Sequence, residues 1–189
     1  MSASVVIVSY NSAHRLRACL DALRDVFDFA LDQVIVVDNH SSDDSAAVAK
    51  AACPEAIVIR NAANVGFARA VDQAIDVATG DHVVLVNPDV HSVTGSLDRV
   101  HELLAEPDVA AVAVTLTDDN GVLQRSCRTT QTPMTIIGQS VSLDGRLPGW
   151  HVSRTHEMLD WEMADERDVD QACGAVLFLS RRAIERVGL

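Results

Sequence analysis

Short apolar runs alternate with stretches of helical spacing along the first half of the chain. Runs rich in β-branched residues are expected to form strands at residues 5–8, 34–37, 56–59 and 82–86. Between them apolar residues recur every three or four positions, as at Leu16, Leu20 and Leu23. This alternation predicts βαβ units with right-handed crossovers, and therefore an α/β fold with a doubly wound, mostly parallel sheet flanked by helices.

The helices between these runs have recognisable boundaries. The first is expected to begin at Ser12, whose side chain can cap it, and the next two at about 43–52 and 67–78. No GxGxxG motif follows the first strand, and no GxxxxGK[ST] motif occurs. The fold is therefore neither a dinucleotide-binding Rossmann domain nor a P-loop NTPase by motif.

The run His82–Val86 reads as the central strand, because four of its five residues are apolar and three are β-branched. It stops at Asn87-Pro88, since proline has no N–H with which to continue a central strand. Asp89 then lies just beyond the carboxyl end, where open α/β sheets bind ligands. A carboxylate there suits Mg²⁺ or Mn²⁺ carrying a diphosphate, although an ordinary Asn-Pro-Asp turn is the alternative.

The second half of the chain is less regular. A helix is expected over 96–105, a strand over 109–114, and a hairpin turn at Asp118–Gly121 with its returning arm over 122–126. No period holds from Arg128 to about Asp165, and an acceptor-facing lid would fit a connection of this length. A last strand is expected over 175–179, followed by a helix over 181–187 that stops at Gly188.

Composition places the 189 residues in one globular domain, 1–189, with 48% hydrophobic and 22% charged residues. The net charge of −12 argues against nucleic acid as a general partner. No apolar run approaches the roughly 20 residues of a transmembrane segment, so the chain is expected to be cytoplasmic. Its four cysteines lack zinc spacing and are expected to be reduced and mostly buried.

Polar residues end three of the expected strands. Tyr10 and Asn11 follow the first, Asp38 and Asn39 the second, and Asp89 the fourth. On one sheet edge these residues would converge on a single binding crevice. The alternative is that Asn and Asp end strands simply as turn formers. His82, His91 and His101 have no metal-ligand spacing and are read as surface or strand-edge residues.

Several segments together resemble successive motifs of family 2 glycosyltransferases, which are inverting, nucleotide-sugar-dependent enzymes of the glycosyltransferase-A fold. These segments are Val5–Asn11, Val37-Asp38-Asn39-x-Ser41-x-Asp43, Asn64-x-Gly66-Phe67-Ala68 and Asn87-Pro88-Asp89. Asp160-Trp161 and Val169-Asp170-x-x-x-Gly174-Ala175, with Arg181-Arg182 beyond, are similar to the rhamnosyltransferase-like branch and its acceptor-side motif. The resemblance covers nearly the whole chain.

The resemblance implies a role for each matching residue. Tyr10 and Asp38 would hold the nucleotide base, Asp38 accepting from its ring N–H. Asn64, Gly66 and Arg69 would lie near the ribose and diphosphate, with Gly66 letting the backbone approach closely at a helix N-terminus. The nucleotide-sugar site as a whole would comprise Ser9, Tyr10, Asn11, Asp38, Asn64, Gly66, Arg69, Asn87 and Asp89, with Gly174 and Ala175 on the acceptor side.

Asp89 matches the last residue of the family's Asp-x-Asp motif, and it is the expected ligand of Mg²⁺ or Mn²⁺. The first Asp of that motif is Asn87 here, which leaves two-carboxylate metal binding open.

An inverting transfer needs a general base to take the proton of the attacking hydroxyl. The resemblance implies that the matching acid follows the stretch around Arg181–Gly188, beyond Leu189, so the catalytic residue is unknown. The acids at 165, 166, 168 and 170 precede the Gly174-Ala175 segment and do not match the base. We therefore expect the domain to lack its C-terminal part, and the exposed face to favour self-association.

The resulting hypothesis is transfer of a sugar, with rhamnose as the candidate, from a nucleotide diphosphate sugar to an acceptor hydroxyl with inversion. The acceptor is left open between a glycan, a lipid-linked and a small molecule. A cytoplasmic enzyme without a transmembrane segment could also sit peripherally at the inner face of the membrane. Two alternatives stay open, a degenerate or truncated nucleotide-binding domain without turnover and a nucleotidyltransferase.

Overall fold

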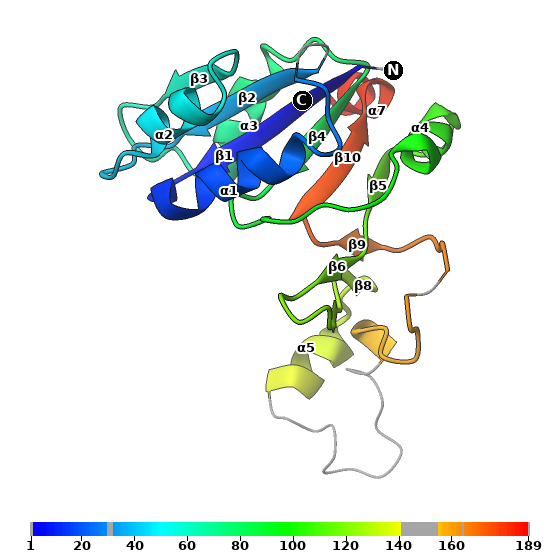
Figure 1. Cartoon of the computed structure of the whole chain (residues 1–189). Coiled ribbons are helices and arrows are strands. Elements are labelled where there is room, and N and C mark those ends of the chain that lie inside the picture. The colour runs from blue at the N-terminus through cyan, green and yellow to red at the C-terminus, as the bar shows by residue number, and fades with distance from the viewer. Residues whose placement is uncertain (1, 30–31, 141–154, 164, 189) are drawn as a thin grey trace. The chain divides into compact units, whose positions relative to one another are not determined.

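Six strands form the central sheet of the computed structural model, which describes residues 2–29, 32–140, 155–163 and 165–188. The strand order is β3-β2-β1-β4-β10-β5 (Figure 1). The four strands expected in the first half all form, at β1 Ala3–Ser9, β2 Gln33–Asp38, β3 Ile57–Arg60 and β4 His82–Val86. They pair in parallel, as predicted, and every residue of β4 is buried.

The two remaining strands of the sheet run in the opposite sense to each other. β10, Val176–Ser180, is antiparallel to β4 and also to β5, Ala111–Ala113. Because β10 is antiparallel, its first residue lies at the edge where β4 ends, and Val176 pairs with Val86. Gly174 and Ala175 therefore arrive at the same sheet edge as Asp89.

Helices cover both faces of the sheet, as the alternation predicted (Figure 1). One side carries α1 and α2, and the other carries α3 and α7. A core on the α3 side joins Val6, Ile35 and Leu85 of the sheet to Ala74 of α3 and Ile184 of α7. The helices run over α1 Ala13–Leu23, α2 Ser45–Ala52, α3 Phe67–Ile75, α4 Asp98–Ala105 and α7 Arg181–Val187.

Gly80 marks the tightest approach at the amino edge of the sheet. A Cβ on this residue would lie 2.6 Å from the carbonyl carbon of Ala3 and from the amide nitrogen of Ser4. Arg181 holds the same loop, because its Nε and Nη2 donate to the carbonyl oxygens of Gly80 and Ala78 at 3.1 and 3.0 Å. The second half of the chain thus returns to fix the turn before β4.

Contacts divide the chain into two compact units, the sheet unit of residues 1–113 and 174–189 and a second unit of residues 114–173. The expectation of a single nucleotide-sugar-binding domain stays a prediction. In the second unit β6, Leu116–Thr117, pairs with β7, Leu123–Gln124, across the expected turn, which confirms the hairpin. β8, Cys127–Arg128, pairs with β9, Gln171–Ala172.

The second unit also contains a helix that the sequence pattern missed, α5 over Pro133–Ser140. Its exposed Met134, Ile136 and Ile137 do not form one face against polar residues, so no amphipathic period reveals it. Residues 141–154 of the expected lid lie outside the described residues. None of the helices in the described ranges is long and apolar enough to cross a membrane.

His82 is buried, contrary to the expectation of a surface or strand-edge histidine. Its side chain is 1% exposed, and neither ring nitrogen has a hydrogen-bond partner within the described part of the chain. The ring of His101 lies 5.0 Å away between centroids, and that of Phe178 6.2 Å away. Burial lowers the pKa of His82 below its usual 6.5, the charge of His101 lowers it further, and Asp32 and Asp81 oppose the shift.

The lowered pKa of His82 makes the protein less stable in mild acid. The unfolded chain takes up this proton near pH 6.5, whereas the folded chain does so only at lower pH. The free energy of unfolding should therefore fall as pH drops below about 6.5, by at most about 1.4 kcal/mol per pH unit for one proton. Urea unfolding of wild type and His82→Phe at pH 7.5 and 5.5 measures the effect.

His82→Phe should flatten the pH dependence between these two values, because it keeps a ring in the core and removes the titration. Exposed His91 provides the control, and His91→Gln should behave as wild type. If His82→Phe loses as much stability as wild type between pH 7.5 and 5.5, a different group is responsible.

Candidate functional site

The carboxyl ends of β1, β2 and β4 meet at one edge of the sheet. β1 pairs with β2 on one side, with Ser9 opposite Asp38, and with β4 on the other, with Ile7 opposite Val86. The strand order turns between β1 and β4, which makes this the switch point where open α/β sheets bind ligands. The polar residues that follow the three strands are therefore gathered along one edge, as predicted.

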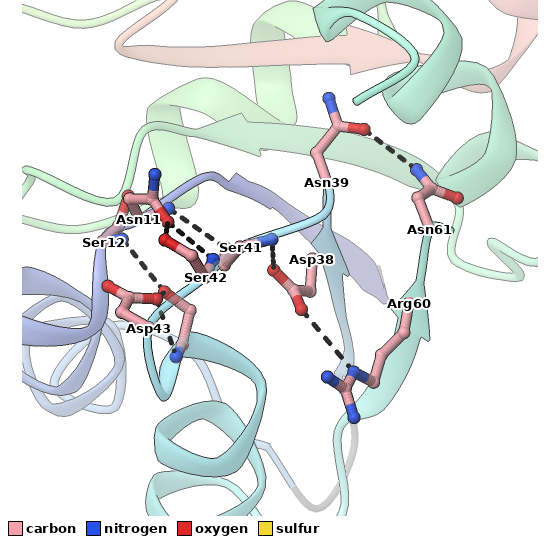
Figure 2. Close-up of polar contacts among 10 residues, drawn as sticks. Asn11, Ser12, Asp38, Asn39, Ser41, Ser42, Asp43, Arg60 and Asn61 are labelled. Atoms are coloured by element: carbon pink, nitrogen blue, oxygen red, sulfur yellow. Dashed lines mark hydrogen bonds and ion pairs between the residues drawn. The ribbon is translucent and has the colours of Figure 1, made fainter. Parts of the chain in front are cut away.

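Asp38 is the buried carboxylate of this edge, with 2% of its surface exposed. Its Oδ1 accepts a hydrogen bond of 3.1 Å from the backbone N–H of Ser41. Its Oδ2 lies 3.6 Å from Nε of Arg60, which is the residue opposite it on β3 (Figure 2). Both oxygens thus have a partner in the folded protein. Ser9, on the neighbouring strand, is also fully buried, and its hydroxyl has no hydrogen-bond partner among the described residues.

The loop after β1 is tied to the loop after β2. The backbone N–H of Asn11 donates to Oγ of Ser41 at 3.0 Å, and Oδ1 of Asn11 accepts from the N–H of Ser42 at 2.8 Å (Figure 2). Asn11 adopts a positive φ of 50°, which asparagine tolerates better than most residues. These bonds fix the backbone beside Tyr10, whose side chain is 53% exposed and free to face a ligand.

Asp43, not Ser12, supplies the polar partner at the start of α1. The expected cap was wrong, because the Ser12 hydroxyl donates to the carbonyl of Tyr10 and makes no cap bond. Oδ2 of Asp43 instead accepts from the N–H of Ala13 at 3.0 Å. The hydroxyl of Ser45 and then this N–H lower the pKa of Asp43 below its usual 3.8, because both bonds favour the charged form.

Asn39 connects three segments of the edge, whereas the sequence placed it only among the polar residues expected to converge on one binding crevice. Its Oδ1 accepts from Nδ2 of Asn61 at 3.1 Å and from the N–H of Val65 at 3.0 Å. Its Nδ2 donates to Oδ1 of Asn64 at 3.0 Å and to the carbonyl of Gly66 at 3.3 Å. The N–H and the carbonyl determine which way the amide points. Since the side chain is 3% exposed, Asn39 acts as a buried support for the loop from Asn61 to Gly66.

Gly66 is needed for its backbone conformation. It lies just before α3 with φ 86° and ψ 163°, a region that only glycine adopts readily. A Cβ there would meet no protein atom within 4 Å, and the expected close approach of the backbone to a ligand stays a prediction. The space beside Gly66 is open, and Arg69, in the first turn of α3, is exposed. The first N–H groups of a helix have no intrahelical acceptor, which suits an anion.

The Asn87-Pro88-Asp89 turn is held from two sides. The N–H of Asn87 donates to the carbonyl of Ala175 at 2.8 Å, and the thiol of Cys19 donates to the carbonyl of Asn87 at 3.6 Å. Burial, with the charge of Asp89 adding to it, raises the pKa of Cys19 to about 12. The thiol is therefore a structural donor, and Cys53 and Cys127 are buried free thiols, as expected, whereas Cys173 is exposed.

Asp89 itself is exposed at the end of this turn. In the part of the chain that the structure describes, no group of three or more His, Cys, Asp or Glu side chains is arranged to hold a metal ion. Asp89 thus offers one exposed carboxylate at the end of β4, and Asn87 precedes it by two positions. Mg²⁺ is commonly held by one or two carboxylates together with substrate phosphates, so these residues fit a cation that arrives with a diphosphate.

Two hollows of the sheet unit lie elsewhere. One, of about 790 Å³, is lined by residues 24–29 and Glu55, and the other, of about 470 Å³, lies beside Ala3, Asp32 and His101. Ala3 begins β1 and Asp32 precedes β2, so the second hollow opens at the amino edge. Polar side chains line the carboxyl edge, which is the sheet edge where β1, β2 and β4 end. That edge is therefore the better candidate for a ligand-binding site.

A protein-family model matches most of the chain. A model described as "Glycosyl transferase family 2" matches residues 4–168. The N-acetylglucosaminyl-diphospho-decaprenol L-rhamnosyltransferase of Mycobacterium tuberculosis strains CDC 1551 and H37Rv is 27% identical over 200 aligned residues. That alignment covers 97% of this chain and 63% of the relative, so the chain spans less than two thirds of the relative's length.

Solved structures share the fold. The mannosyltransferase PcManGT of Pyrobaculum calidifontis, in complex with GDP-Man and Mn²⁺, matches with a TM-score of 0.58 at 20% identity, over 98% of this chain and 46% of that protein. TarS 1–349 of S. aureus, in complex with UDP-GlcNAc, matches with a TM-score of 0.54 at 22% identity, over 67% and 38%. The sheet is thus of the glycosyltransferase-A type.

Asn39 should be essential to the order of the Asn61–Gly66 loop. Asn39→Ala removes four hydrogen bonds and leaves the Val65 N–H without its acceptor, which should lower the free energy of unfolding by about 1–3 kcal/mol. Urea unfolding measures this loss. Asn64→Ala is the matched control, because Asn64 is exposed and the change removes two bonds, those from Nδ2 of Asn39 and from the N–H of Gly66, so it should cost less. Wild-type stability in Asn39→Ala would show that the network is dispensable.

Proposed function

Because the chain belongs to glycosyl transferase family 2, we propose that the carboxyl edge of its sheet unit binds a nucleoside diphosphate sugar and presents the sugar to an acceptor hydroxyl. The alignment of Tyr10, Asp38 and Asp89 along three adjacent strands is the observation that carries this proposal. Neighbouring strands lie about 4.8 Å apart, so the ends of β2 and β4 are separated by roughly 10 Å. That span suits a nucleoside with its base at Asp38 and its diphosphate at Asp89.

The chain's own residues would bind and orient the donor. Tyr10 offers an exposed aromatic ring against which a base can pack, and the Asp38 carboxylate accepts the base's ring N–H. The start of α3 and the exposed Arg69 face the anionic oxygens of the diphosphate. The acceptor hydroxyl would bond to C1 of the sugar with inversion as the bond from C1 to the diphosphate breaks, and its proton would pass to a general base, which stays unassigned. Gly174 and Ala175, at the same edge, would border the acceptor.

Asp89, with Asn87 two positions before it, would hold a divalent cation such as Mn²⁺ or Mg²⁺ together with the diphosphate. When bound, the cation would offset negative charge on the departing phosphates. The complex of PcManGT with GDP-Man and Mn²⁺ supports this choice of ion. The Cys19 thiol and the Ala175 carbonyl fix the Asn87 backbone and so determine where the Asp89 carboxylate stands.

The relatives support the choice of sugar and acceptor. The M. tuberculosis relatives are L-rhamnosyltransferases named for a lipid-linked acceptor, N-acetylglucosaminyl-diphospho-decaprenol. We propose L-rhamnose as the transferred sugar and a lipid-linked saccharide as the acceptor, which would bring the protein to the membrane surface. TarS and PcManGT, with UDP-GlcNAc and GDP-Man, support a nucleoside diphosphate sugar as the donor class.

Calorimetric titration of the chain with UDP and with thymidine diphosphate, each with and without Mn²⁺, tests the proposed function. We expect binding that strengthens with Mn²⁺, because the base and the metal engage opposite ends of the same ligand. Inorganic pyrophosphate is the control, since it lacks the nucleoside and should bind more weakly. Binding of pyrophosphate as tight as that of UDP, or no binding of any nucleoside diphosphate, would contradict the proposal.

Replacing Asp89 should uncouple nucleotide binding from the metal. Asp89→Ala should retain its fold, because Asp89 is exposed, and should lose the Mn²⁺-dependent part of UDP affinity, about tenfold or more. Calorimetry at two Mn²⁺ concentrations measures the change. Asp108→Ala is the control, since Asp108 is exposed and precedes β5 at the opposite edge of the sheet.

A second variant tests the metal site in the opposite direction, by adding a possible ligand. Asn87→Asp adds a second carboxylate beside Asp89 and should increase the Mn²⁺ dependence of UDP binding. Unchanged Mn²⁺ dependence in both Asp89→Ala and Asn87→Asp would place the metal elsewhere.

A further inference from the structure

Arg60 is a cation at the carboxyl edge to which the proposed reaction gives no role. It ends β3, and the pairing of β2 with β3 places it directly opposite Asp38. Its side chain is 72% exposed, whereas that of Asp38 is 3% exposed. An ion pair with one partner in water stabilises a fold little, because solvent screens it and the long side chain loses entropy. Stability alone therefore gives a weak reason for an arginine here.

The geometry of the pair has a chemical consequence. Nε of Arg60 lies 3.6 Å from Oδ2 of Asp38, while Oδ1 is taken by the Ser41 N–H. The guanidinium has five N–H groups in a plane, so groups beyond Nε still point outward. The end of β2 and β3 thus presents a hydrogen-bond donor, Arg60, directly beside an acceptor, Asp38 (Figure 2).

Nucleotide bases differ in which pattern they offer in return. Uracil, thymine and guanine carry a carbonyl oxygen next to a ring N–H, so they offer an acceptor beside a donor. Cytosine and adenine carry an amino group next to a bare ring nitrogen, so they offer the reverse. Only the first group matches a donor beside an acceptor, and the second group places donor against donor and acceptor against acceptor.

We propose that Arg60 is a specificity-determining residue that donates to the base carbonyl while Asp38 accepts the adjacent ring N–H. The pair would admit nucleoside diphosphates with a carbonyl beside a ring N–H, and would exclude those of cytidine and adenosine. This rests on the proposed function, since it assumes that the base lies at Asp38. Two features hold the pair in register, namely the β2–β3 pairing and the bond from the Asn61 N–H to the Asp38 carbonyl at 2.9 Å.

UDP and CDP provide the sharpest test, because they differ only at this edge of the base. Calorimetric titration in Mn²⁺ should give wild type an affinity for UDP about tenfold or more above that for CDP, since CDP leaves both protein groups unpaired. Arg60→Gln should lose about tenfold in UDP affinity and little in CDP affinity, because an amide can turn to suit either base. The ratio of UDP affinity to CDP affinity should thus fall well below that of wild type but stay above one, because Asp38 still accepts the ring N–H that uracil has and cytosine lacks.

Two further variants separate the base contact from charge and from folding. Arg60→Lys keeps the charge and one donor, so its ratio should lie between those of wild type and Arg60→Gln. Arg99→Gln is the matched control, because Arg99 is also an exposed arginine paired with a carboxylate, 2.9 Å from Glu102 on α4. It should keep the wild-type ratio. Thermal unfolding of each variant checks that the fold is retained.

Each outcome decides the matter. An equal loss of UDP and CDP affinity in Arg60→Gln would assign Arg60 to the diphosphate or to general charge, and would overturn the proposal. Equal affinities of wild type for UDP and CDP would overturn it as well, while leaving nucleotide binding intact. If wild type binds neither nucleotide, the proposed function itself fails and this inference falls with it.

Discussion

The parallel pairing of β1 with both β2 and β4 is the constraint on which the candidate site depends. Buried strands must satisfy every backbone N–H and carbonyl, so the register of β1 fixes where its neighbours end. Ser9 then lies opposite Asp38, and β4 ends one strand away on the other side. A shift of one residue would turn each strand's apolar side chains to the wrong face. The alignment of Asp38 with Asp89 is therefore a by-product of core packing, and it cannot drift while the core is intact.

Packing fixes the strand ends, and buried polar side chains fix the loops between them. Asn39 uses its whole amide on four partners, and Asp43 and Asn11 tie the loop after β1 to the loop after β2. Such networks are costly when broken, because each orphaned group keeps its desolvation penalty. The loops thus gain a defined shape without apolar burial. This leaves Tyr10, Arg69 and Asp89 exposed on a rigid support, as a ligand site requires.

Periodicity predicted the sheet and its helices well, because apolar spacing directly records which residues face the core. The predicted ends of the strands also located Tyr10, Asp38 and Asp89 at one edge of the sheet. What the sequence concealed are the partnerships between segments. Asn39 bonds residues 22–27 positions away, and Arg60 meets Asp38 only through strand pairing. Ser12 looks like a cap, yet Asp43 does the bonding. The burial of His82 was hidden because it is the first residue of β4, and strand ends are often exposed. In the folded chain β10 pairs with it and the ring of His101 on α4 lies against it.

The protein's overall charge makes these local arrangements decisive for binding. With a net charge of −12, the chain repels a nucleoside diphosphate at long range, so electrostatic steering cannot gather the donor. In the proposed site, attraction would have to come from nearby groups, namely Arg60 at the base end and the start of α3 with Arg69 at the phosphate end. A single carboxylate at Asp89 adds negative charge to that end, which a phosphate would avoid unless a divalent cation came between them. Affinity for the anionic donor should accordingly depend on the cation more steeply than on ionic strength.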